Sequence, residues 1–207
     1  ISLLANGGRE KDAFEVNKML YLAGAMSSES DIKKIVEYYQ YYEMPFQAAV
    51  IFEREMNAGR ISKNADNLVR LSELFRQARE YKRALPILEQ AANASGRSKS
   101  WAQYGEALYN QGICNDAETA LRKAMDMGYD RGKSWMLIAN CRYEAGQKEE
   151  RPSCDGTTPE QRLASPKVKK NELALEAFRK VPATARDYRS AQKWIDFVGN
   201  ENKSYEF

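Results

Sequence analysis

The sequence predicts an all-α protein, a solenoid of helix-turn-helix repeats with a capping helix at its C-terminal end. Apolar residues recur at helical spacing along the chain, and a tryptophan-led phrase occurs twice. Trp101 opens W-A-Q-Y-G-E-A-L-Y-N-Q-G, a polar turn and A-E-T-A-L-R-K-A follow, and Trp135 opens W-M-L-I-A-N-C-R-Y-E-A-G about 34 residues later. Because a single hairpin cannot bury the apolar stripes of both its helices, each repeat needs neighbours.

The first segment, 1–30, is predicted to be a partial repeat. Asn6-Gly7-Gly8 is typical of the turn between two helices, and the chain starts at Ile1 without methionine or signal peptide, so a fragment is expected. A helix is predicted from about residue 9 to 26. Its expected buried stripe is Ala13, Val16, Leu20 and Ala23.

Two full repeats follow, at about 31–63 and 64–97. Pro45 favours the start of a second helix, because its missing N–H costs little at that position. Pro86 lies about one turn inside the matching helix and predicts a kink or a late start. The expected core positions of these repeats are Ile32, Ile35, Val36, Tyr39, Ala48, Phe52, Met56, Leu68, Leu71, Phe75, Tyr81, Ala84, Leu88 and Ala91.

The third repeat is predicted at about 98–130 and the fourth at 131–182. Between the two helices of the fourth repeat the spacing is longer, and residues 147–170 are expected to form an exposed loop, with prolines at 152, 159 and 166. The loop is either a tolerated surface insertion or an arm that contacts a partner or a second copy. The second helix is expected to resume at Glu172. A capping helix at 185–198 and a frayed tail complete the chain.

Composition limits the possible functions. The 207 residues are 43% hydrophobic and 29% charged, which suits a folded chain. The net charge of +3 is close to balance, so nucleic acid is not an expected partner. No apolar run approaches the ~20 residues of a membrane-spanning helix, so direct membrane insertion is not expected.

The sequence offers little to catalysis. It has no histidine, which removes the commonest general base and metal ligand, and its three cysteines are too scattered for a zinc site. No nucleotide-binding, metalloprotease or nucleophile motif is present. We therefore expect no enzymatic activity, catalytic residue, metal or cofactor.

The third repeat carries a recognisable family pattern. With Trp101 at repeat position 4, the positions 8, 11, 15, 20, 24 and 27 are held by Gly105, Leu108, Gly112, Ala117, Leu121 and Ala124. This pattern resembles the tetratricopeptide-repeat (TPR) family. The resemblance implies a right-handed α-solenoid and a non-enzymatic scaffold that binds a protein or peptide on its concave surface.

The resemblance also implies which residues line that surface, namely those at set positions of the first helix of each repeat. They are Lys33, Glu37, Arg70, Glu73, Gln77, Gln103, Glu106, Asn110, Asn140 and Tyr143. The set is polar and includes both positively and negatively charged side chains. Each residue taken singly is equally compatible with an ordinary solvated helix face.

A second resemblance concerns setting. The phrases M-L-Y-L-A-G-A-M-S-S-E-S, Y-Y-E-M-P-F-Q-A-A, A-R-E-Y-K-R-A-L-P-I-L-E-Q-A and A-Q-K-W-I-D-F-V resemble the C-terminal part of bacterial TPR proteins assigned to TonB energy-transduction systems. This implies a periplasmic accessory protein that helps couple an inner-membrane motor to outer-membrane uptake of iron complexes. The alternative is a cytosolic adaptor or assembly factor on the same fold. An upstream signal peptide would separate the two.

The cysteines bear on the same question. In the repeat register Cys114 lies near the start of one second helix, and Cys141 lies in the later part of the next first helix, so the two are expected to be neighbours. They are either buried as small hydrophobes or, in an oxidising compartment, joined as a disulfide, with Cys154 as a free or competing thiol. A bridge requires Cα atoms within about 7 Å.

Overall fold

The structure, a computed structural model, describes residues 9–153 and 155–207. These residues form eleven helices and no strand, which confirms the all-α class. The chain divides into two compact units, residues 1–95 and 96–207. The expected Asn6–Gly8 turn and Cys154 lie outside the described residues.

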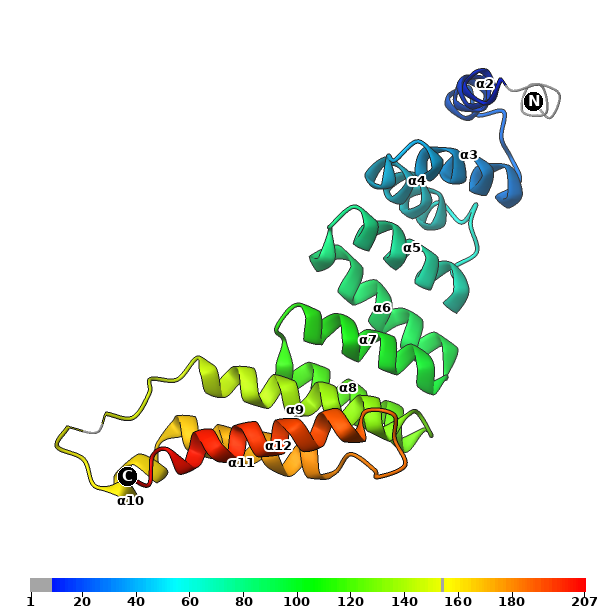
Figure 1. The fold of residues 1–207 in the computed structure, drawn as a ribbon. Coiled ribbons are helices and arrows are strands. Elements are labelled where there is room, and N and C mark those ends of the chain that lie inside the picture. The colour runs from blue at the N-terminus through cyan, green and yellow to red at the C-terminus, as the bar shows by residue number, and fades with distance from the viewer. Residues whose placement is uncertain (1–8, 154) are drawn as a thin grey trace. The chain divides into compact units, whose positions relative to one another are not determined.

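The first unit consists of one helix and two hairpins (Figure 1). Its helices are α2 (Glu10–Leu22), α3 (Glu29–Tyr41), α4 (Pro45–Asn57), α5 (Ala65–Gln77) and α6 (Tyr81–Ser95). Helices α3 and α4 pair, as do α5 and α6, and α4 packs on α5. Ser28 and Asn64 start α3 and α5 by accepting hydrogen bonds from backbone N–H groups one turn into each helix.

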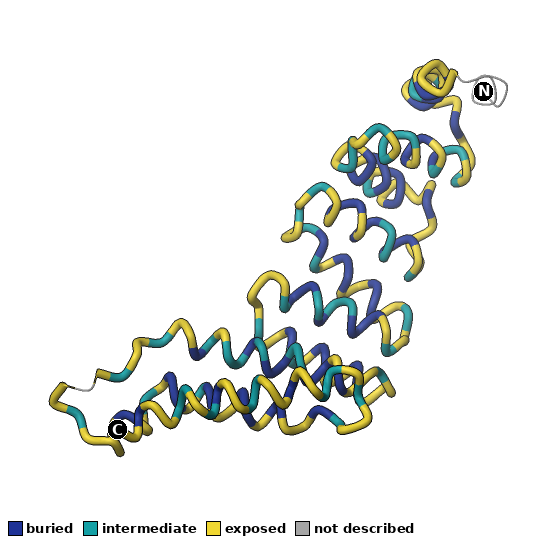
Figure 2. The backbone as a smooth tube through the Cα atoms, in the orientation of Figure 1, coloured by how far each residue is buried: buried dark blue, intermediate teal, exposed yellow. Residues whose placement is uncertain are grey.

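The predicted core of the two hairpins in this unit is largely confirmed. Ile32, Phe52 and Phe75 are among its fully buried side chains, and only Tyr81 of the expected positions is exposed. Buried residues recur between exposed ones along each helix, as Figure 2 shows by colour. Helix α6 begins at Tyr81 and runs through Pro86, so the predicted late start is wrong.

The prediction for the first helix was wrong in its extent and in part of its buried face, although Ala13 is buried as expected and Leu20 packs against the core. Helix α2 ends at Leu22, and its buried residues are Ala13, Phe14, Asn17 and Tyr21. Val16 is 37% exposed. Phe14 accounts for the difference, because its ring packs against three tyrosines of the unit, with centroids 5.0–5.9 Å apart. The side of α2 that carries Phe14 therefore faces the core, and the side that carries Val16 does not.

The second unit contains α7 (Ser98–Asn110), α8 (Cys114–Asp126), α9 (Arg131–Gln147), α10 (Pro159–Leu163), α11 (Pro166–Arg179) and α12 (Tyr188–Lys203). Helix α7 pairs with α8 and α9 pairs with α11. A Cβ atom on Gly105 would lie 2.8 Å from Cγ of Leu121, so only glycine allows α7 and α8 to approach this closely. Gly112 supplies the positive φ, 71°, of the turn between them.

The predicted exposed loop at 147–170 is wrong in its second half. Helix α11 begins at Pro166, earlier than the expected Glu172, and Val168 is buried. Pro159 and Pro166 do not interrupt structure. Each stands at the first position of a helix, where its missing N–H costs little.

The insertion is also tied to the C-terminal tail. Arg162, only 5% exposed, donates from Nε to the carbonyl oxygen of Tyr205 at 3.0 Å and from Nη1 to that of Thr157 at 2.8 Å. Tyr205 is 2% exposed. The expected frayed tail is therefore wrong as well. Helix α12 runs beyond the expected residue 198 and packs Ala191 and Val198 into the core of the unit.

Candidate protein-binding surfaces

The described residues contain no set of three or more His, Cys, Asp and Glu side chains placed to hold a metal ion. Among the same residues, no helix combines the length and apolarity that crossing a membrane requires. The candidate sites are the surface positions that the repeat register predicts. We call the predicted positions on α3 and α5 the first-unit face, and those on α7 and α9 the second-unit face.

The first-unit face is held together by amide and guanidinium contacts. Arg70 donates to Oε1 of Gln40, and Nε2 of Gln40 donates to Oε1 of Gln77 at 2.9 Å. These bonds join α3 to α5. Beside them Glu73, Arg76, Gln77 and Tyr81 line a depression of about 360 Å³. The structure thus brings Arg70 and Gln77 together through a residue of the neighbouring helix.

Lys33 has a structural partner. Its Nζ lies 2.7 Å from Oε1 of Glu29, which also accepts from Asn67 Nδ2 at 3.0 Å, while Glu29 Oε2 accepts from Ser62 Oγ at 2.7 Å. These donors, Lys33 first, lower the pKa of Glu29 to about 2. Glu37, one turn along α3, remains exposed.

The second-unit face is also cross-linked between its helices. Lys133 of α9 forms an ion pair with Glu106 of α7 at 2.5 Å, and the hydrogen bond raises the pKa of Lys133. Gln103 is half-buried and Asn110 is exposed. Oδ1 of Asn140 is buried without a hydrogen-bond partner among the described residues.

Tyr143 lies against the last helix. Its OH donates to Oε2 of Glu201 at 3.3 Å, and burial together with the Glu201 charge raises the pKa of Tyr143 to about 12. Its ring centroid lies 5.2 Å from Trp194 and 6.1 Å from Phe197 of α12. Tyr143 is therefore partly covered by a helix that the sequence indicated only as a cap.

Helix α12 adds a surface that sequence reasoning missed. Ser190, Lys193, Trp194 and Phe197 line a mostly apolar hollow of about 360 Å³. Their spacing of three and four residues places them on one side of a helix, and this was the signal that could have revealed the hollow.

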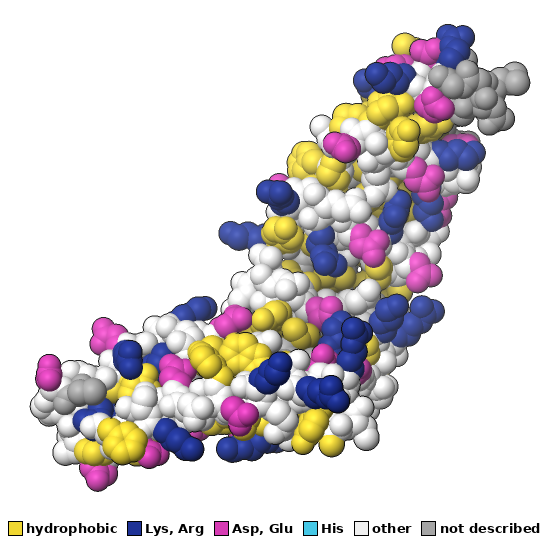
Figure 3. Space-filling view, viewed as in Figure 1, with side chains coloured by type: hydrophobic (Ala, Val, Ile, Leu, Met, Phe, Trp, Pro, Cys, Tyr) yellow, Lys and Arg dark blue, Asp and Glu magenta, His cyan; other side chains and the backbone are white. Residues whose placement is uncertain are grey.

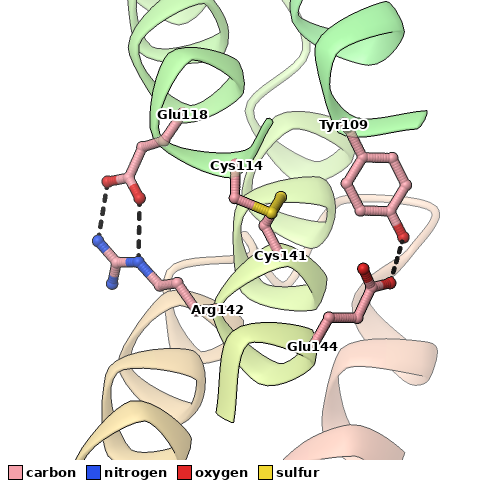
Figure 4. The surroundings of a disulfide bond; sticks show 6 residues. All are labelled: Tyr109, Cys114, Glu118, Cys141, Arg142 and Glu144. Carbon is pink, nitrogen blue, oxygen red and sulfur yellow. Dashed lines mark hydrogen bonds and ion pairs between the residues drawn. A yellow bond between two sulfur atoms is a disulfide. The ribbon is translucent and has the colours of Figure 1, made fainter. Parts of the chain in front are cut away.

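A disulfide joins two hairpins of the second unit. Cys114, the first residue of α8, is bonded to Cys141 of α9, and their Cα atoms are 5.5 Å apart. That distance is within the limit the hypothesis required. Figure 4 shows the bond between two polar contacts. Arg142 donates to both carboxylate oxygens of Glu118, at 2.8 and 3.1 Å, and the OH of Tyr109 donates to Glu144 at 3.0 Å.

Comparison with known proteins identifies the fold. No family model matches the chain, and neither does any curated protein. Among solved structures, the MamA protein gives a TM-score of 0.60 at 13% identity, over 86% of this chain and 84% of that one. The C-terminal part of a TPR repeat-containing protein from Cytophaga hutchinsonii gives a TM-score of 0.60 at 14% identity, over 98% of this chain and 70% of that one. YrrB, described as a TPR protein with an unusual peptide-binding site, gives a TM-score of 0.52 at 18% identity, over 85% of this chain and 81% of that one. The chain therefore has the fold of a TPR α-solenoid.

Proposed function

We propose that the chain is a non-enzymatic scaffold in which each of the two faces, the first-unit face and the second-unit face, binds an extended or helical segment of another protein. Solved structures with the same fold are TPR proteins, and one of them, YrrB, has an unusual peptide-binding site. The observation that carries the proposal is the pattern on the faces. Polar side chains of neighbouring helices are linked to one another, as Arg70, Gln40 and Gln77 are, and so present fixed donors and acceptors.

Substitution of the faces tests this proposal. Arg70, Gln103 and Asn140 are replaced together by alanine, and partner capture from the native host is compared with the wild type. A matched control replaces Lys82, Gln90 and Asn115, which are exposed on the second helices α6 and α8. Capture should fall in the face variant and persist in the control, with helical content unchanged in both. Capture that persists in the face variant would move the site elsewhere.

The setting we propose is the periplasm of a Gram-negative bacterium, as an accessory component of a TonB-type iron-uptake system. The phrase resemblance supports the system. The Cys114–Cys141 disulfide supports the compartment, because disulfides persist in the periplasm and are rare in the cytosol. The competing setting is a cytosolic adaptor or assembly factor.

Two measurements separate these settings. Fractionation of the native host should place the protein in the periplasmic extract, with an upstream signal peptide in the full-length sequence. Purification from that host should bring down a TonB-system protein. A cytosolic location together with an unrelated complex would refute the setting while leaving the scaffold function intact.

A further inference from the structure

We propose that α12 is part of the binding surface, and that its hollow anchors an acidic partner segment through one bulky apolar side chain. We name Tyr143, Lys193, Trp194 and Phe197 the α12 aromatic site. The inference rests on the proposed scaffold function and adds to it the chemistry of the bound segment. It also gives α12 a role beyond covering the end of the second unit.

The floor of the α12 aromatic site is rigid. Trp194 stacks on Phe178, with ring centroids 5.7 Å apart and planes 4° from parallel. Phe178 is fully buried in the core of the unit, and Tyr143 and Phe197 meet the Trp194 ring at 5.2 and 5.7 Å. Because Trp194 and Phe178 are already held by packing, a bound side chain would not have to order them.

The site also leaves apolar surface in water. Phe197 is 56% exposed, although its neighbours on the inner side of α12, Ala191 and Val198, are buried. The hollow of about 360 Å³ beside it is lined mostly by apolar atoms. Aromatic groups at the centre of a hollow are the usual anchors of protein recognition, because a partner side chain can remove them fully from water.

The charge around the hollow favours an acidic partner. Arg189, Lys193 and Phe197 follow one another at four-residue spacing and so lie along one row of the helix. Arg189 and Lys193 are exposed and form no ion pair with any described residue. Figure 3 shows Lys and Arg side chains beside hydrophobic ones on the face formed by α9 and α12, with Asp and Glu side chains also present there.

The nearby acidic groups do not neutralise this row. Glu201 is engaged by Lys167, at 3.1 Å, and by Tyr143, while Asp196 is a single exposed carboxylate. Asp187, the N-cap residue of α12, already places a carboxylate at the positive end of the helix, so the cations open to a partner are Arg189 and Lys193. Carboxylates on the partner, one and two helical turns of α12 away from its apolar anchor, would therefore meet Lys193 and Arg189.

Three fluorescein-labelled nine-residue peptides test the proposal by fluorescence anisotropy with the whole chain. The first carries four acidic residues around one phenylalanine, the second replaces that phenylalanine with alanine, and the third replaces the acidic residues with lysine. We expect the first peptide to bind about tenfold more tightly than either of the others. Phe197→Ala and Lys193→Glu should each weaken its binding by at least about tenfold.

The matched controls lie in the first unit. Phe46→Ala removes another exposed aromatic ring, and Lys11→Glu reverses another exposed lysine. Both should bind the first peptide as the wild type does. The thermal unfolding midpoint of Phe197→Ala should equal that of the wild type, since the exposed ring contributes little to the core. An equal midpoint shows that the variant keeps the fold.

The proposal is overturned if the first peptide binds no more tightly than the lysine peptide, if none of the three binds, or if Phe197→Ala leaves binding unchanged. Sedimentation that shows a wild-type dimer lost in Phe197→Ala would overturn it too, because the site would then join two copies of the chain. None of these results would refute the scaffold function. That function is tested separately, by the loss of partner capture when Arg70, Gln103 and Asn140 are substituted.

Discussion

Removing the disulfide should destabilise the second unit by a predictable amount. The bond links residues 27 positions apart, and closing a loop of that length restricts the unfolded chain by about 3.5 kcal/mol at 25 °C in the chain-entropy account. For a unit of this size such a loss lowers the unfolding midpoint by roughly 10–15 °C. Circular dichroism melting of the oxidised protein, with and without dithiothreitol, measures this shift.

Two variants make the measurement specific. The Cys154→Ser protein removes the third thiol and should retain the full effect of the reductant. The Cys114→Ala, Cys141→Ala protein should melt at the lower temperature in both conditions. Mass spectrometry of protein alkylated without reduction should find Cys114 and Cys141 unmodified. Full alkylation of both residues in freshly isolated protein, or a midpoint that the reductant does not move, would refute the disulfide.

Three further predictions concern the fold. Gly105→Ala should cost about 1–3 kcal/mol in urea unfolding, because the new Cβ would lie 2.8 Å from Leu121 Cγ, and an unchanged midpoint would contradict that contact. Arg79→Gly should stabilise the first unit by about 1 kcal/mol, since Arg79 holds a φ of 61° in its turn, and a loss of stability would show that its side chain matters more than the strain. The pKa of Glu29 falls from 4.5 to about 2 on folding. Its contribution to the stability of the folded state is therefore complete above pH 4.5 and is lost as the pH falls towards 2. Glu29→Gln should flatten this part of the stability profile, whereas an unaltered profile would show that Glu29 is not responsible.

The hairpins could be predicted because their pattern is redundant. Trp101 and Trp135 mark equivalent positions, and the small residue at 105 has a purpose only if a second helix packs directly on the first. Spacing of this kind determines which residues face the core, whatever the neighbouring repeats are. For this reason the predicted core residues of α3 to α8 are mostly buried in the structure.

Helix α2 shows where this reasoning fails. Two apolar stripes were possible on α2, one through Val16 and one through Phe14, and composition does not choose between them. The choice depends on Tyr39 of α3 and Tyr42 just after it, whose rings pack against Phe14. A contact between residues this far apart in the sequence is not contained in the local pattern of either helix.

The prediction of an exposed loop at 147–170 failed for a different reason. Prolines 159 and 166 are equally compatible with a loop and with the first position of a helix. The difference lies in the residues before them, because Thr158 and Ser165 cap the two helices by accepting backbone N–H bonds. A search for such caps would have detected both helix starts.

The candidate site was predicted from repeat positions and therefore omitted contacts outside the repeats. Tyr143 holds a predicted binding position, yet it packs against α12. Lys33 is different, because its partner Glu29 lies four residues earlier in the same helix, a pair that the sequence spacing could have indicated. The register alone predicted that Cys114 and Cys141 are neighbours, but it left both two free thiols and a disulfide open, and the structure has the disulfide. The positions that depend only on the repeat could be predicted, and those that depend on the last helix could not.

Site-specific photo-crosslinking in the native host tests the central claim most directly. A photoreactive amino acid is placed at Gln103 or Asn140 on the second-unit face, and at Gln90 or Asn115 on the second helices. The account predicts that Gln103 and Asn140 crosslink to the same partner protein and that Gln90 and Asn115 do not. Crosslinks to that partner from Gln90 or Asn115 alone would contradict it.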